Sequence, residues 1–113
     1  MNLTLHRAAA FEADVAAQFD WYLDEAGDSV AWRFFAAVDS TLVDLAQHPG
    51  LGRLRQFRHP ALKGLRSFRV QPPFELHLVF YRHTDLELSA ERLLHGRRDL
   101  PRRLREPPGS GED

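Results

Sequence analysis

The chain contains no cysteine, so disulfide bonds and thiolate metal sites are excluded, and a reducing compartment suits it. Long apolar runs are also missing: none approaches the roughly 18 residues that a membrane helix needs. The first residues, MNLTLHRAAAFEADV, contain early acidic residues and no apolar signal-peptide core. Together these features predict a cytoplasmic protein with no membrane segment.

Common catalytic and nucleotide-binding motifs are absent as well. The sequence has no HExxH, no GxGxxG, no phosphate-binding P-loop and no GxSxG. His48, His59 and His77 are not spaced as metal ligands, and Gly50 and Gly52 are too few to surround a phosphate. We therefore predict neither a metal nor a cofactor.

Lysine is scarce, because 14 of the 15 basic residues are arginine and the other is Lys63. The net charge of −1 also hides an asymmetry along the chain. Residues 1–50 hold two basic and eight acidic residues, a balance of −6, whereas residues 51–106 hold 13 basic and six acidic residues, a balance of +7. Arginine favours bidentate contacts with carboxylate or phosphate, so the C-terminal half is a candidate anion-facing surface. The alternative is that these arginines pair with the acidic N-terminal helices.

At 113 residues and 43% hydrophobic composition, the chain fits one modest domain, which we place at residues 1–105. Residues 106–113, EPPGSGED, are predicted to be a disordered tail. Leu3 and Leu5 alternate with polar residues and predict a short first strand.

Two amphipathic helices follow this strand. Residues 8–26 carry one apolar stripe at spacings of three and four: Phe11, Val15, Phe19, Tyr22 and Ala26. Gly27 is expected to end that helix. Asp28 or Ser29 is expected to cap the second helix, which ends at His48-Pro49-Gly50. Its stripe comprises Ala31, Phe34, Phe35, Val38, Leu42 and Leu45. The tight link predicts an αα-hairpin.

The second half of the chain is predicted to contain a loop and three strands. Residues 51–63 are predicted to be a basic loop, followed by strands at Leu65–Val70, Phe74–Arg82 and Leu86–His95. In the second of these strands, Phe74, Leu76, Leu78 and Phe80 share one face, and Glu75, His77, Val79 and Tyr81 share the other, as in a half-buried strand. Short turns between the three strands indicate an antiparallel meander. The fold class is therefore α+β, with a short N-terminal strand and the αα-hairpin packed on one face of the sheet.

Strand parity places two arginines among apolar residues. Arg66 shares a face with Phe68 and Val70, and Arg92 shares one with Leu88, Ala90 and Leu94. Since an unpaired buried charge is costly, both need partners. One hypothesis is structural ion pairing, with Glu91, Asp99 or the acidic helices. The other is a cleft that binds phosphate or a partner's carboxylates. Arg69 falls on the opposite face from Arg66 and is expected to be solvated.

His95 ends the last predicted strand. Its ordinary pKa near neutrality suits a general acid or base, although an ordinary hydrogen-bonding role is the commoner one. Asp99 either caps a short final helix or pairs with an arginine.

With these elements placed, the sequence resembles the ParE branch of the RelE/ParE toxins of type II toxin–antitoxin systems. The resemblance runs from about Leu3 to Leu104 and is carried by AAAFEADVAAQFDWY, AWRFFAAVDSTLVDLAQHPGLG, GLRSFRV, HLVFYR and ERLLHGRRDL. The last three, in that order and spacing, are the specific part. The resemblance implies a helical hairpin on an antiparallel sheet.

The resemblance also implies a growth-arresting toxin that a cognate, ParD-like antitoxin neutralises in a hetero-oligomer, through an acidic or amphipathic C-terminal tail. ParE-like toxins inhibit DNA gyrase by binding, whereas RelE-like relatives cut mRNA on the ribosome. For a nuclease, the candidate catalytic residues are Arg66, Arg92 and His95. A single lysine and the lack of tyrosine after Tyr81 argue against a complete catalytic set. A non-toxic relative that acts as a binding module is the third alternative.

Two binding surfaces follow from the resemblance. The target would be bound by four arginines near the C-terminus: Arg97, Arg98, Arg102 and Arg103. The alternative is that these four form a solvated helix face. The antitoxin tail would fill a groove at the hairpin and extend the sheet edge. Its predicted contacts are Trp21, Trp32, Phe57, Arg66 and Arg92. Core packing is the alternative role for the aromatic residues, and it is favoured for Tyr22.

Overall fold

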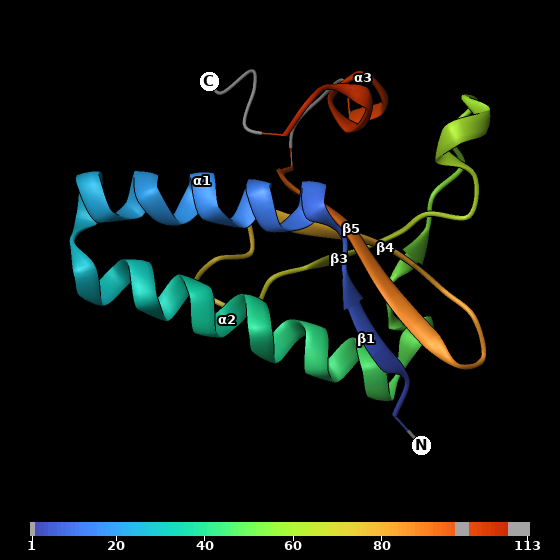
Figure 1. Cartoon of the computed structure of the whole chain (residues 1–113), viewed down its shortest axis with the longest axis horizontal. Coiled ribbons are helices and arrows are strands. Elements are labelled where there is room, and N and C mark those ends of the chain that lie inside the picture. Colours follow the sequence, from blue (N-terminus) through green and yellow to red (C-terminus); the bar gives the residue numbers. More distant parts are fainter. Residues whose placement is uncertain (1, 97–99, 109–113) are drawn as a thin grey trace.

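A computed structural model describes residues 2–96 and 100–108. Its elements are β1 (Thr4–Arg7), α1 (Ala9–Ala26), α2 (Asp28–Gln47), η1 (Pro49–Leu51), β2 (Arg53–Leu54), η2 (Pro60–Leu62), β3 (Arg66–Arg69), β4 (His77–His83), β5 (Glu87–His95) and α3 (Leu100–Arg105). Figure 1 shows α1 and α2 side by side as a hairpin whose open end meets the sheet. The predicted α+β class and the αα-hairpin are thus confirmed. No helix in the described ranges has both the length and the apolar character to cross a membrane.

Gly27 makes the sharp turn between the two long helices. Its φ of 92° lies in the left-handed region, which glycine tolerates best, and its N–H donates to Tyr22 O at 3.0 Å. Gly27 also occupies the N-cap position of α2, where no side chain caps the helix. The prediction that Asp28 or Ser29 is the cap was therefore wrong. Asp28 lies instead in the first turn, where its negative charge interacts favourably with the positive end of the helix dipole.

The sheet has five strands in the order β1-β5-β4-β3-β2. Strands β3, β4 and β5 form the predicted antiparallel meander, so Phe68, Leu78 and Leu88 share one sheet. Strand β1 adds a parallel pairing to β5, with Leu5 opposite Leu88, which makes the sheet mixed. Strand β2 lies inside the predicted loop and pairs with β3. Two residues are too few to show alternation, which explains why the sequence did not reveal this strand.

Both faces of the sheet are covered. The first face packs under α1 and α2 around a buried cluster that includes Phe11, Phe34, Val79, Tyr81 and Leu88. The second face packs against α3 and the η2 segment around Leu62, Leu65, Phe80, Leu94, Leu100 and Leu104. β4 is therefore buried on both faces, and the prediction of a half-buried strand was wrong.

The start of β4 also differs from the prediction. The strand begins at His77, because Phe74–His77 form a turn in which His77 N–H donates to Phe74 O at 3.0 Å. This turn lets Phe74 pack in the first-face cluster, whereas simple alternation grouped it with Leu78 and Phe80 of the second face.

A β-bulge in β5 changes the face of Arg92. Phe80 is opposite Arg92 and Tyr81 is opposite Ala90, so Glu91 is the extra residue. Leu88 and Ala90 consequently face the helices, while Leu94 faces α3. The predicted shared face of Arg92 with Leu88 and Ala90 was wrong, because parity cannot be counted across a bulge.

Candidate functional site

A groove of about 300 Å³ runs between α1 and α2. Phe11, Val15 and Val38, which also belong to the first-face core, line it. Three aromatic residues, Phe19, Trp32 and Phe35, line it as well. The groove is thus a largely apolar trough built on two rigid helices.

The aromatic residues stay open to solvent although they pack against one another. The rings of Phe19 and Trp32 are 4.8 Å apart, and Trp32 and Phe35 are 5.8 Å apart. Trp32 is nevertheless 60% exposed. Exposed aromatic surface in a preformed groove is typical of protein–protein interfaces, whose strongest contacts are often tryptophans.

Carboxylates surround this apolar surface. Glu12, Asp20 and Asp39 all line the groove. Asp39 accepts a hydrogen bond from Arg7 Nη2 at 3.0 Å, and no ion pair within the described residues involves Glu12 or Asp20. The groove therefore favours a ligand with an apolar face and positively charged flanks.

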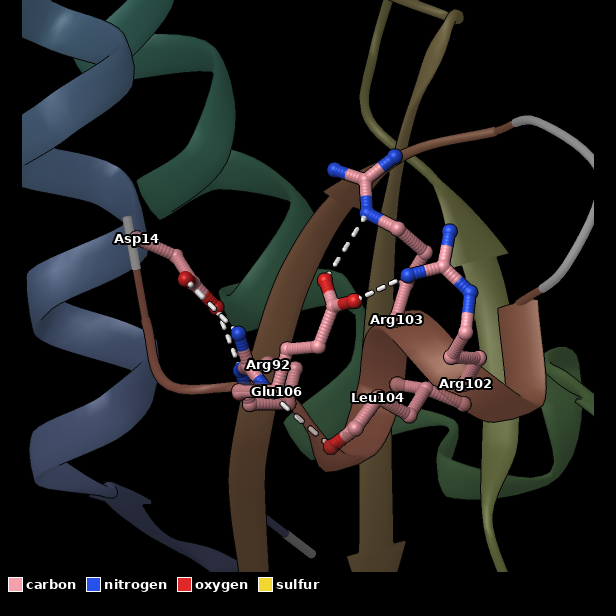
Figure 2. A network of polar contacts seen from close by, with 6 residues as sticks. All are labelled: Asp14, Arg92, Arg102, Arg103, Leu104 and Glu106. Atoms are coloured by element: carbon pink, nitrogen blue, oxygen red, sulfur yellow. Dashed lines mark hydrogen bonds and ion pairs between the residues drawn. The ribbon is translucent and has the colours of Figure 1, made fainter. Parts of the chain in front are cut away.

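Arg92 forms a buried polar network at the edge of the sheet (Figure 2). Its Nε and Nη2 donate to the two carboxylate oxygens of Asp14 in α1, at 2.7 and 3.1 Å. Its Nη1 donates to Leu104 O at 3.0 Å and to Glu106 O at 2.9 Å. Asp14 also accepts from Leu93 N–H at 3.0 Å. Arg92 is 8% exposed and Asp14 7%.

This network connects α1, β5 and the end of α3. Four donated hydrogen bonds engage the Arg92 guanidinium inside the chain, so the structural ion-pair hypothesis describes it, with an acidic helix as the partner. Asp14 was not predicted individually as that partner. Its position three residues after Phe11, within the apolar stripe of α1, was an available signal.

Two of the three α3 arginines, Arg102 and Arg103, lie beside Glu106 (Figure 2). Arg102 forms a hydrogen-bonded ion pair with the Glu106 carboxylate, and Arg103 Nε lies 3.8 Å from it. Glu106, assigned to the predicted tail, is thus held by its side chain and its carbonyl. The predicted target-binding residues Arg97 and Arg98, Asp99 and tail residues 109–113 lie outside the described residues.

Arg66 belongs to a second polar cluster, on the first face. Its Nη1 donates to Gly52 O at 2.7 Å. Gly52 N–H donates to the Tyr81 hydroxyl at 2.9 Å, and that hydroxyl donates to Pro49 O at 2.6 Å. Burial raises the pKa of Tyr81, which keeps the donating proton on the hydroxyl. These contacts fasten the η1–β2 segment to the sheet.

His95 lies opposite His77 in the sheet, with the two rings 5.5 Å apart. His77 is 3% exposed, and its Nε2 is 2.9 Å from the Tyr22 hydroxyl. Tyr22 packs against Phe34 and Phe74, which agrees with the core role favoured for it. Burial, and secondarily the charge of His95, lowers the pKa of His77 to about 4. His77 is therefore neutral near pH 7.

Acidification should destabilise the chain through His77. In the unfolded chain its pKa returns to about 6.5, so the unfolded state binds the proton first as the pH falls from about 6.5 to about 4. We expect a loss of about 2 kcal/mol of unfolding free energy between about pH 7 and about pH 5 from this residue. Urea denaturation at several pH values measures this loss. His77→Gln, which does not titrate, should reduce the pH dependence by that amount, and an unchanged profile would refute the assignment.

The three candidate catalytic residues do not form one site. Arg66 is opposite Tyr81 near one end of the meander, and His95 is opposite His77 near its other end. Arg92 is opposite Phe80 on the second face and is engaged by Asp14. No common point brings these side chains to one phosphate.

The predicted antitoxin contacts also separate. Trp32 lines the groove, whereas Trp21 is 54% exposed, packs on the Tyr22 ring and does not line the groove. Phe57 packs with the second-face cluster. Arg69, opposite Leu78, is exposed on the second face, away from Arg66, as predicted.

Comparison with known proteins agrees with this fold. The family model described as the ParE toxin of the type II toxin–antitoxin system parDE matches residues 5–100. Among solved structures, one described as the chromosomal ParDE TA system from P. aeruginosa superposes with a TM-score of 0.66. It shares 19% sequence identity, and the match covers 82% of this chain and 95% of that one. No curated protein matches the chain. Because the family match spans nearly all of the folded domain, the chain belongs to the ParE toxin family of type II toxin–antitoxin systems.

Proposed function

We propose that this chain is a growth-arresting toxin of the cytoplasm, that a cognate antitoxin neutralises it in a hetero-oligomer by occupying the α1–α2 groove, and that its target is DNA gyrase. The groove is the observation that carries the antitoxin proposal. It is preformed, apolar, and surrounded by exposed aromatic residues in a chain of the ParE toxin family. A segment that covers it would remove water from that surface.

The groove favours one of the two kinds of antitoxin tail considered from sequence. An amphipathic helix matches a trough between two helices, with apolar side chains at the spacings of one helix face. Its flanks should carry lysine or arginine near Glu12 and Asp20, because Asp39, the third carboxylate of the groove, is already paired with Arg7. A wholly acidic segment would meet repulsion there.

Trp32 should be the strongest single contact for the antitoxin. Trp32→Ala removes an exposed aromatic wall of the groove and should weaken antitoxin binding at least about tenfold, with little change in stability. The antitoxin to use is the protein encoded next to this chain, and titration calorimetry measures the affinity.

Trp21→Ala is the matched control, because Trp21 is similarly exposed on α1 but does not line the groove. It should change the affinity less than about threefold. Equal losses from the two variants would place the antitoxin elsewhere on the hairpin.

Inhibition of gyrase by binding is favoured over RNA cleavage by the positions of the candidate catalytic residues. Cleavage through the 2′-hydroxyl needs an acid, a base and cationic groups around one phosphate. Arg66, Arg92 and His95 occupy different parts of the sheet, and Arg92 is buried.

The purified chain should therefore inhibit supercoiling by gyrase and leave ribosome-bound mRNA intact. Both assays should use the same preparation, with and without the antitoxin, which should restore supercoiling. Intact supercoiling together with cleaved mRNA would reverse the proposal. Activity in neither assay, with no growth arrest on expression, would favour a non-toxic binding module.

A further inference from the structure

A long internal segment of the chain carries positive charge and no negative charge. Residues 45–74 contain no aspartate or glutamate, but they contain Arg53, Arg55, Arg58, Lys63, Arg66 and Arg69. In the structure this segment supplies β2, η2 and β3, at the side of the sheet away from β1. Its charge therefore accumulates on one part of the molecule.

Strand pairing gathers three of these arginines around one serine of the second face. Arg53 lies directly opposite Ser67, and Ser67 lies opposite Phe80 of the second-face core. Arg69, two residues after Ser67, projects from the same face, opposite Leu78. Arg55 donates from Nη1 to Ser67 Oγ at 2.9 Å. Arg53, Arg55 and Arg69 are named here the arginine trio.

The trio has no carboxylate partner within the described residues. Arg53 and Arg69 are exposed and make no ion pair there, while Arg55 is held by a serine and by two aromatic rings. Its guanidinium carbon lies 5.3 Å from the centre of the Phe57 ring and 6.0 Å from that of Phe80. Burial, together with the like charge of Arg53, lowers the pKa of Arg55.

This arrangement differs from that of the other arginines on the sheet. Arg92 has a carboxylate and two carbonyls, and Arg82 donates to Lys63 O and Ala61 O. Those side chains stabilise the fold. The arginine trio instead holds like charges close together on a surface, and an anion between them would convert this repulsion into attraction.

We propose that the arginine trio binds the phosphate backbone of a nucleic acid. Arg53 and Arg69 belong to the neighbouring strands β2 and β3, and Arg55 follows directly after β2, so each guanidinium can meet a successive phosphate of a polymer. Phe57, under Arg55, adds an aromatic ring of the kind on which unpaired bases stack. Binding through backbone charges also needs no apolar pocket beside the arginines, in contrast to binding of a peptide.

Fluorescence anisotropy of the full chain tests this proposal. The probes are a labelled DNA single strand of about 20 nucleotides, its duplex, and a labelled glutamate-rich peptide of similar charge, in about 50 to about 200 mM salt. We expect DNA to bind, with an affinity that falls steeply as salt rises, and the peptide to bind more weakly. The single strand should bind more tightly than the duplex if Phe57 stacks on bases.

Arg53→Ala and Arg69→Ala are the informative variants, because both side chains are exposed and neither makes a hydrogen bond or ion pair within the described residues that the fold would lose. Together they should weaken DNA binding at least about tenfold and reduce the salt slope by about 1.4 for a single strand. Arg33→Ala, an exposed arginine of α2, is the matched control and should change neither quantity appreciably. Arg53→Lys with Arg69→Lys should keep most of the salt slope.

Three results would overturn the proposal. They are no DNA binding at the lowest salt, an equal loss from Arg33→Ala, and tighter binding of the glutamate-rich peptide than of DNA. The last result would assign the arginine trio to an acidic protein segment. None of these outcomes depends on whether gyrase is the target, so this test and the supercoiling assay can fail separately.

Discussion

Arg92→Ala is expected to lower the unfolding free energy by about 3–5 kcal/mol. The substitution leaves the buried Asp14 carboxylate without its ion pair and two carbonyls, of Leu104 and Glu106, without their donor. A charge left alone in a buried site costs more than the net value of the original pair. Arg92→Lys should recover little, because one ammonium group cannot reach both the carboxylate of α1 and the carbonyls after α3.

Urea denaturation followed by circular dichroism measures this effect. The matched control is Arg105→Ala, which removes an exposed arginine of α3 that has no ion pair in the described residues and should change stability by less than about 0.5 kcal/mol. Asp14→Ala should destabilise the chain to a similar degree as Arg92→Ala. A loss below about 1 kcal/mol for both would mean that water replaces the pair, contrary to its burial.

Gly52→Ala should cost about 3 kcal/mol or more. Gly52 has a φ of −71°, so its backbone alone would accept a side chain. A Cβ at this position would lie 2.3 Å from the Tyr81 hydroxyl oxygen and 2.6 Å from its Cε1, well inside contact distance. Tyr81 is fully buried and cannot move without breaking its hydrogen bonds to Gly52 and Pro49.

Gly50→Ala provides the control two residues away. A Cβ there has nothing within 4 Å, and the substitution should be close to neutral. Thermal unfolding of the two variants separates steric exclusion by Tyr81 from a general loss of backbone freedom in the η1 segment. Equal melting temperatures for the two variants would show that Tyr81 can be displaced cheaply.

The parts of the fold that could be predicted from the sequence are those with a hydrophobic periodicity that extends over many residues. The helical stripes around Phe11 and Phe34 extend over several turns, and Gly27 marks their junction, so the hairpin was predicted correctly. Alternation in the second half likewise predicted the three meander strands and their order, although β5 contains the bulge at Glu91. Strand β2 and the parallel pairing of β1 depend on distant partners, which local periodicity does not contain.

The candidate site was predictable only where it depends on side-chain type. Trp32 was identified as a contact residue by its chemistry, but the groove depends on how α1 and α2 pack. Arg92 was identified as a charge that needs partners, yet the bulge at Glu91 directed it to another face. Ala90 and Leu93 both belong to the first-face core, yet they are three residues apart. Residues on one face of a regular strand are separated by an even number, so this odd spacing was the local sign of the bulge.

The parallel pairing of β1 with β5 has a consequence for synthesis on the ribosome. Thr4 pairs with Glu87, so the first strand has no place in the sheet until more than 80 further residues have been made. The helical hairpin can form early from local contacts, whereas sheet closure waits for the last strand. A nascent chain therefore has its helices well before it has its complete fold, and translation arrested before β5 yields a fragment in which β1 is unpaired.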